Sequence, residues 1–186
     1  MRCPWCESSD LYRRYHDEEW GRPSRDERHL FEMLLLEGAQ AGLSWSTILN
    51  KREGYRQVFE GFDPARLAAY TDAELETRLG DPRIVRNRLK VYAVRRNAQA
   101  YQRLCAGHGS LRDWLWRWVD DQPLVNRPRT LQEVPPRTAL SDAISKALQT
   151  LGFTFVGSTI VYAWLQATGV VCDHLQDCPW HPDHRP

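Results

Sequence analysis

The sequence has no apolar run that approaches the roughly 18 residues required by a membrane-spanning helix. Its longest apolar stretch, residues 159–171, is interrupted by Gln166 and Gly169. Residues 1–6 contain no apolar segment of the signal-peptide type. We therefore expect a cytoplasmic protein that makes no contact with a membrane.

Several common catalytic signatures are also missing from the 186 residues, among them a Ser/His/Asp arrangement, a phosphate-binding glycine loop and a nucleotide-binding fingerprint. Internal repeats and low-complexity segments are absent too. Hydrophobic residues make up 42% of the chain and charged residues 26%, which is typical of a soluble globular protein. This length and composition predict one domain over residues 1–186.

The chain carries little net charge, only +1, but its charges are unevenly placed. Seven basic residues and no acidic residue lie between Arg83 and Arg103. A local basic face on a nearly neutral protein is typical of a site for a defined anionic partner. A solvated helix face would give the same pattern, and charge alone does not choose between the two.

Helix start and stop signals follow one another along the chain and predict an all-α fold. Residues 121–138 are rich in proline and predict an ordered loop, while the short alternating run 153–156 is too isolated to form a sheet. Capping residues are expected to be Ser44, Thr71 (with Glu74 completing a capping box), Ser110 and Ser141. The predicted helices cover residues 26–43, 45–58, 65–70, 72–79, 87–106, 111–119, 142–151 and 158–168.

Five cysteines in a chain without an export signal favour metal binding or simple burial over disulfides. Cys3 and Cys6 have the spacing of a zinc knuckle, and His174 and Cys178 are spaced to share one side of a helical turn. On spacing alone, these four residues predict a structural zinc site that joins the two termini. Buried thiols and surface histidines are the alternative reading, and the competing ligands are His16, Cys172, His181 and His184.

Glu37 is an acidic residue on an apolar stripe. In the predicted helix 26–43 it aligns with Leu30, Leu34 and Ala41. A carboxylate at such a position has a partner, is protonated, or faces a cleft. Small residues follow it and lead to the large ring of Trp45, which favours a binding site. A helix cap or an arginine partner explains Glu37 equally well from the residues alone.

Together these segments resemble the bacterial 3-methyladenine DNA glycosylase I family over nearly the whole chain. The resemblance rests on Arg2-Cys3 with Trp5, Tyr12-x-x-Tyr15-His16-Asp17-x-Glu19-Trp20-Gly21, Leu30-Phe31-Glu32-Met33, Leu36-Glu37-Gly38-x-Gln40-Ala41-Gly42-Leu43-Ser44-Trp45, Lys51-Arg52-Glu53, Arg86-Asn87-Arg88-x-Lys90, Ser145-Lys146-x-Leu148, Gly152-Phe153-x-Phe155-Val156-Gly157 and Asp173-His174.

The resemblance implies a helix-hairpin-helix glycosylase fold, with the hairpin near residues 75–100 and one structural Zn²⁺ per chain. The family's zinc ligands fall on Cys3, His16, His174 and Cys178, so that His16 replaces Cys6 in the set chosen by spacing. The implied base pocket has Glu37 as the catalytic and base-recognising acid, and aromatic residues as its walls. Tyr15 and Trp45 would sandwich the damaged base, with Tyr12, Trp5 and Trp20 nearby.

The same resemblance implies contacts with double-stranded DNA. Leu43, after Gly42, resembles the wedge that fills the space of a flipped nucleotide. The residues expected to hold phosphates are Arg83, Arg86, Asn87, Arg88 and Lys90. Arg83 and Leu89 stand where the wider superfamily often has glycine.

The implied activity is hydrolytic excision of 3-methyladenine by a monomeric enzyme. A lyase step is not expected, because none of the three lysines (Lys51, Lys90 and Lys146) falls in the candidate pocket. The alternative is a zinc-stapled module that binds alkylated DNA without cleaving it. Such a module would tolerate the loss of Glu37.

Overall fold

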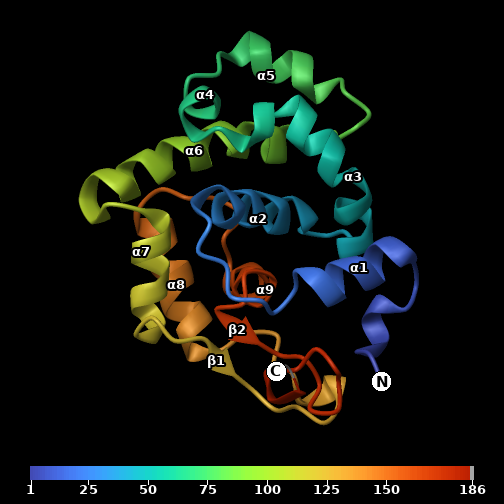
Figure 1. The fold of residues 1–186 in the computed structure, drawn as a ribbon. Helices are drawn as coiled ribbons and strands as arrows, with labels where there is room; N and C mark the ends of the chain where they lie inside the picture. The colour runs from blue at the N-terminus through green and yellow to red at the C-terminus, as the bar shows by residue number, and fades with distance from the viewer. Residues whose placement is uncertain (185–186) are drawn as a thin grey trace.

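The computed structural model describes residues 1–184, and over this part of the chain it is mainly helical (Figure 1). The described helices and strands are α1 (Asp10–Glu18), α2 (Glu27–Gln40), α3 (Trp45–Val58), α4 (Pro64–Ala68), α5 (Asp72–Leu79), α6 (Arg88–His108), α7 (Leu111–Trp116), β1 (Leu124–Val125), α8 (Ala139–Thr150), α9 (Ser158–Ala167) and β2 (Val171–Cys172). The expected mainly helical fold is therefore confirmed. None of the described helices is both long enough and apolar enough to cross a membrane.

Helix α2 runs through the middle of the molecule, between α3 to α6 on one side and α1, α7 and α9 on the other (Figure 1). Every residue from Leu30 to Ala39 is buried. The indole N–H of Trp164 in α9 donates a hydrogen bond to the carbonyl of Leu30 at 2.9 Å, which joins the two central helices. Glu37, which belongs to this segment, therefore lies inside the core and not at the edge of an apolar stripe.

Most predicted helix starts are confirmed by their caps. Asp26, Ser44 and Thr71 each accept a hydrogen bond from a backbone N–H in the first turn of α2, α3 and α5. Thr71 and Glu74 form the expected capping box. These short-range signals identify helix starts correctly because the bonds involve only neighbouring residues.

Four local expectations are wrong. Helix α8 begins after Thr138 and not after Ser141, because Thr138 and Ser141 form a capping box that adds a turn. The helix after Ser110 ends at Trp116 and continues as a 3₁₀ turn. His174 and Cys178 share no helical turn, since residues 173–177 form an irregular loop. Helix α1 has no counterpart among the predicted helices.

The structure also contains a strand pair that the sequence did not predict. β1 and β2 pair in parallel, Leu124 with Val171 and Val125 with Cys172. β1 lies inside the proline-rich segment 121–138, which is otherwise the expected ordered loop with one 3₁₀ turn. The pairing holds this segment against the chain that leads to the C-terminus (Figure 1).

Candidate functional site

A hollow of about 380 Å³ opens between α1, α2, α3 and α9. Aromatic rings from the N-terminal half of the chain form much of its lining, and the proline-rich segment and the C-terminal part form the opposite wall. The lining residues are Trp5, Tyr12, Tyr15, Trp20, Glu37, Gln40, Trp45, Leu131, Val134, Ala163, Gln166 and Asp173.

Trp5 is the centre of the aromatic wall. Its ring lies edge-on to Tyr12, Tyr15 and Trp20, with centroid distances of 5.1, 6.5 and 4.9 Å. Edge-to-face packing of this kind is favourable and leaves ring faces available to a ligand. Trp45 is the first residue of α3, and its indole Nε1 is buried without a hydrogen-bond partner among the described residues.

Glu37 is the acidic group of the pocket and is only 4% exposed. Within residues 1–184, no N–H or O–H group donates a hydrogen bond to its carboxyl. Burial raises the pKa of Glu37 to about 8, because the charged form is poorly solvated there. The Glu37 carboxyl is therefore an unfilled acceptor that faces an aromatic cavity, where it can bind a cationic or N–H-bearing ligand.

Asp173 is a second buried acidic residue that lines the hollow. Its carboxylate is 2% exposed and accepts hydrogen bonds from Asn126 at 2.7 Å, Tyr162 at 2.6 Å and Gln166 at 2.8 Å. Asn126 follows β1, whereas Tyr162 and Gln166 lie in α9. Asp173 therefore joins the proline-rich segment to the helix that lines the pocket.

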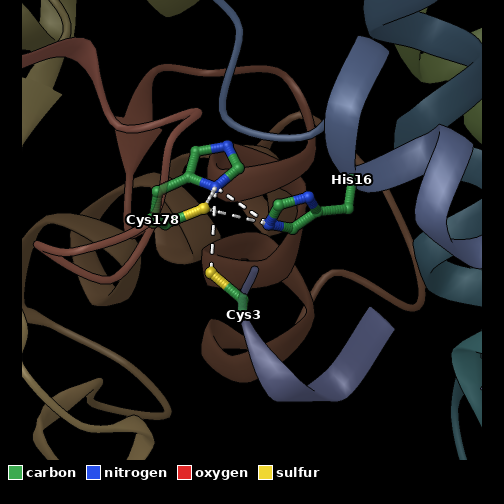
Figure 2. A group of neighbouring side chains, drawn as sticks. Cys3, His16 and Cys178 are labelled. Atoms are coloured by element: carbon green, nitrogen blue, oxygen red, sulfur yellow. Dashed lines mark hydrogen bonds between the residues drawn. The ribbon is translucent and has the colours of Figure 1, made fainter. Parts of the chain in front are cut away.

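A second cluster of functional side chains lies beside the pocket. The ligand atoms of Cys3, His16, His174 and Cys178 all lie within 4.8 Å of one another, and all four residues are buried. Figure 2 shows Cys3, His16 and Cys178 directing their side chains toward one point. These residues come from both ends of the chain, and the Met1 ammonium also contacts the carbonyl of Asp177.

The spacing of the His16, His174 and Cys178 ligand atoms fits three corners of a tetrahedral metal site, and the Cys3 sulfur lies 3.8 Å from His174 Nδ1. The two histidine nitrogens are 3.1 Å apart, and the Cys178 sulfur is 3.6 Å from each of them. A zinc ion with Zn–N near 2.0 Å and Zn–S near 2.3 Å gives edges of about 3.3 Å and about 3.5 Å. Hydrogen bonding with the Cys3 thiol and with both imidazoles lowers the pKa of Cys178, which favours the thiolate that a metal requires.

Outer contacts hold the histidines in place. His16 Nδ1 lies 2.7 Å from a carboxylate oxygen of Asp17, and His174 Nε2 lies 3.0 Å from the carbonyl oxygen of Trp20. Partners of this kind fix the ring orientation of metal-binding histidines. Cys6 is not part of the cluster, because its thiol donates to the carbonyl of Cys3 at 3.1 Å. The set chosen on spacing alone was therefore wrong at this position.

The residues expected to contact DNA lie on the turn before α3, and on the segment that precedes α6 together with the first turn of α6. Gly42 has a φ of +77° with open space where a side chain would stand, and Leu43 beside it is 40% exposed. Arg83 is paired with Asp81, and Arg88 is paired with Glu76.

Three further residues at the start of α6 or just before it differ in their roles. Asn87 caps α6, and Arg86 is exposed with no ion pair among the described residues. Lys90 is directed inward, where its ammonium donates to the carbonyls of Ala39 at 2.8 Å and Ala41.

Comparison with known proteins decides the family. The methyladenine glycosylase family profile matches residues 5–181. The chain belongs to the methyladenine glycosylase family. It is 46% identical to DNA-3-methyladenine glycosylase 1 of Escherichia coli K12 over 185 residues, which covers 100% of this chain and 99% of that protein. It is 44% identical to DNA-3-methyladenine glycosylase of Haemophilus influenzae over 178 residues, 96% of each chain.

A solved structure gives the same result. A variant of 3-methyladenine DNA glycosylase I in complex with 3-methyladenine superposes with a TM-score of 0.95 at 34% identity, covering 99% of both chains. As a member of this family, the chain is a glycosylase. The resemblance inferred from the sequence is confirmed.

The structure brings together the residues that the sequence assigned to a methyladenine glycosylase pocket and to the metal cluster. It adds pocket residues that the sequence did not indicate: Gln40, Leu131, Val134, Ala163, Gln166 and Asp173. Gln40 and Asp173 lie within the sequence segments that resemble the family, so the sequence held a signal for these two residues. Leu131 and Val134 carried none, because only the tertiary packing of the proline-rich segment brings them to the pocket.

Proposed function

We propose that this chain excises 3-methyladenine from alkylated double-stranded DNA by hydrolysis of the N-glycosidic bond. The main support for this proposal is Glu37, whose buried carboxyl has no hydrogen-bond partner among the described residues and faces an aromatic hollow. Support also comes from the relatives named for this activity and from the solved variant that holds 3-methyladenine.

The chemistry of the substrate matches this pocket. A 3-methylated adenine attached to deoxyribose carries positive charge, so its glycosidic bond is weakened. When that bond breaks, its electron pair leaves with the base, which departs neutral. Water supplies the oxygen that bonds to the sugar carbon and releases one proton to the solvent. Electron-rich ring faces attract a cationic base, and the ionised Glu37 accepts hydrogen bonds from its amino edge. Selection and orientation of the base are then the main tasks of the protein.

Access to the base requires that the nucleotide leave the duplex. Leu43 extends from the exposed turn at Gly42 and is suited to occupy the vacated space. The segment of residues 80–87 between α5 and α6 is proposed as the helix-hairpin-helix phosphate contact, through its backbone and the exposed Arg86. Lys90 then has a supporting role, because its ammonium binds backbone carbonyls of the chain that leads to Leu43.

The proposal includes a base-releasing activity without strand cleavage, since a lyase step needs an amine that can reach the sugar carbon. None of the three lysines lines the hollow. Lys51 donates to the carbonyl of Pro82, and Lys90 to those of Ala39 and Ala41.

A structural Zn²⁺ at Cys3, His16, His174 and Cys178 is also part of the proposal. Its support is the close spacing of four buried ligand atoms and the outer contacts of both histidines. When bound, such an ion joins the N-terminal segment that carries Trp5 and Tyr15 to the C-terminal loop that carries Asp173. Four protein ligands fill the coordination sphere, so this role is structural.

The proposed function is tested by incubating the protein with methylated duplex DNA and separating the released bases by chromatography. We expect free 3-methyladenine, with the DNA strands intact until alkali is added. Binding to the methylated duplex without release of any base would replace this proposal with the non-catalytic binder. Immediate strand breaks at the site of base loss would contradict the absence of a lyase step.

A further inference from the structure

One arginine joins three helices beneath the aromatic pocket. Arg52 in α3 donates two hydrogen bonds to Glu19, at the end of α1, at 2.7 and 2.8 Å. Its Nε donates to Glu32 in α2 at 2.7 Å. The Arg52 side chain is only 11% exposed and that of Glu32 only 8%. We call Glu19, Arg52 and Glu32 the three-helix ion network.

The three joined helices also carry pocket groups, among them Tyr15 in α1, Glu37 in α2 and Trp45 in α3. In each case the network residue and the pocket residue are separated by four to seven positions. At 1.5 Å per residue this is about 6–11 Å along the helix. Helices this short move as rigid bodies, so the network sets how the three pocket groups stand relative to one another.

The two pocket rings, Tyr15 and Trp45, have no hydrogen bonds of their own in the part of the chain that the structure describes. Tyr15 lines the base pocket and also a second hollow, of about 300 Å³, that reaches Arg52. Its ring is buried and lies between these two hollows. Within residues 1–184 no hydrogen bond holds the Tyr15 hydroxyl, and the indole Nε1 of Trp45 also has no partner. The positions of both rings depend on where their helices lie.

The guanidinium group of Arg52 is suited to bridge Glu19 and Glu32. Its Nε and its terminal nitrogens point in different directions, so one guanidinium reaches carboxylates on two different helices. A lysine ammonium is a single point charge and cannot reproduce this geometry. Burial alone would raise the pKa of Glu19, but hydrogen bonds from His29 and Arg52 lower it to about 2, so Glu19 is ionised at neutral pH.

We propose that Arg52 is a positioning residue of the base pocket, which sets the separation of Tyr15, Trp45 and Glu37 through Glu19 and Glu32 without touching the base. This inference rests on the proposed function. It predicts that a residue outside the pocket affects both the affinity for the base and the rate of excision. A purely structural salt bridge would affect only the stability of the fold.

The test compares Arg52→Lys with a matched control, Arg56→Lys. Arg56 lies one turn further along α3 and bonds to the same Glu32 at 2.9 Å, but its side chain is 42% exposed and makes no bond to α1. Three quantities are measured: the dissociation constant for free 3-methyladenine, the single-turnover rate of its excision, and the affinity for undamaged duplex. The pocket geometry affects base binding and excision rate. The affinity for undamaged duplex depends instead on the proposed DNA-contact residues.

We expect Arg52→Lys to weaken base binding and slow excision by about tenfold or more, because displacements near 1 Å in a pocket have effects of this size. Affinity for undamaged duplex stays within about twofold, and Arg56→Lys stays within about twofold in all three measurements. Equal values for Arg52→Lys and the native protein would overturn the proposal. A parallel loss of undamaged-duplex affinity would also overturn it, as this would indicate general unfolding.

A second variant covers the case in which Arg52→Lys does not fold. Glu19→Gln keeps the size of the side chain and one acceptor oxygen but loses the charge, and we expect a smaller loss of base affinity. No change in Glu19→Gln would again overturn the proposal. If the native protein releases no 3-methyladenine, the proposed function fails by itself. The positioning role of Arg52 is judged separately, from the binding of free base and of undamaged duplex by these variants.

Discussion

The rings of Tyr15 and Trp45 lie in contact across the pocket, with centroids 5.5 Å apart and planes tilted by 45°. A base stacked between two rings needs two van der Waals gaps, about 7 Å in all. The expected sandwich therefore requires these rings to separate by about 1.5 Å when the base enters.

This relationship predicts a specific change at Trp45. Its indole N–H has no partner, so we expect its NMR signal to shift when 3-methyladenine is added and the ring moves. The indole N–H groups of Trp116 and Trp164 bond to the carbonyls of Ser24 and Leu30 and serve as internal controls. Shifts confined to the controls, or no shift at all, would contradict a base site between these rings.

Glu37→Gln is predicted to stabilise the free protein at high pH. Glu37 remains protonated in the folded state up to pH about 8, whereas in the unfolded chain it ionises near its ordinary value of 4.5. The unfolded state thus loses its proton first, and the free energy of unfolding falls as pH rises between these values. At roughly 1.4 kcal/mol per tenfold change, the variant gains about 2 kcal/mol or more at pH 8.

Urea unfolding of both proteins at pH 5 and pH 8 measures this effect. The stability advantage of Glu37→Gln should be small at pH 5 and larger at pH 8. An advantage that is the same at both pH values would mean that the Glu37 carboxyl is not the buried titrating group described here.

The metal cluster predicts about one zinc per chain. Replacement of His16 by alanine should remove the metal and lower the melting temperature strongly, because three buried ligands are left without an ion. Replacement of Cys6 by alanine should leave the metal content unchanged, since its thiol bonds only to a carbonyl. Elemental analysis with thermal unfolding measures both, and retention of zinc in His16→Ala would contradict the assigned ligands.

Arg86 is predicted to contribute more to DNA binding than Arg88. Arg88 is paired with Glu76, and a phosphate must compete with that partner, whereas Arg86 has no ion pair among the described residues. Arg86→Ala should lower the affinity for duplex and reduce its salt dependence by about one ion. Arg88→Ala should have the smaller effect, and the reverse order would place the phosphate contact elsewhere.

Short-range chemistry made much of this fold predictable. The caps at Ser44 and Thr71 depend on residues within one turn, so the sequence located α3 and α5 correctly. Glu37 was noticeable because an acid on an apolar stripe needs an explanation. The prediction that His16, and not Cys6, belongs to the Cys/His cluster came from the family resemblance. Spacing alone favours Cys6, because it lies close to Cys3 in the sequence.

Long-range packing accounts for what the sequence missed. Nothing near Lys90 in sequence shows that its ammonium turns to the carbonyls of Ala39 and Ala41, some fifty residues away. The triple acceptor role of Asp173 depends on Asn126, which a two-residue strand pair brings into place. Contacts of this kind form only when the whole chain has folded.

The most direct test of the account compares native protein with Glu37→Gln in the release of 3-methyladenine from methylated duplex, at limiting DNA concentration, from pH 6 to pH 9.5. Under these conditions the rate reports the ionisation of the free enzyme. We predict that native excision rises with pH and levels off near pH 8, where Glu37 becomes ionised, and that the variant is slower with a flat profile. Equal rates and equal profiles for the two proteins would contradict the central role of Glu37 in base recognition.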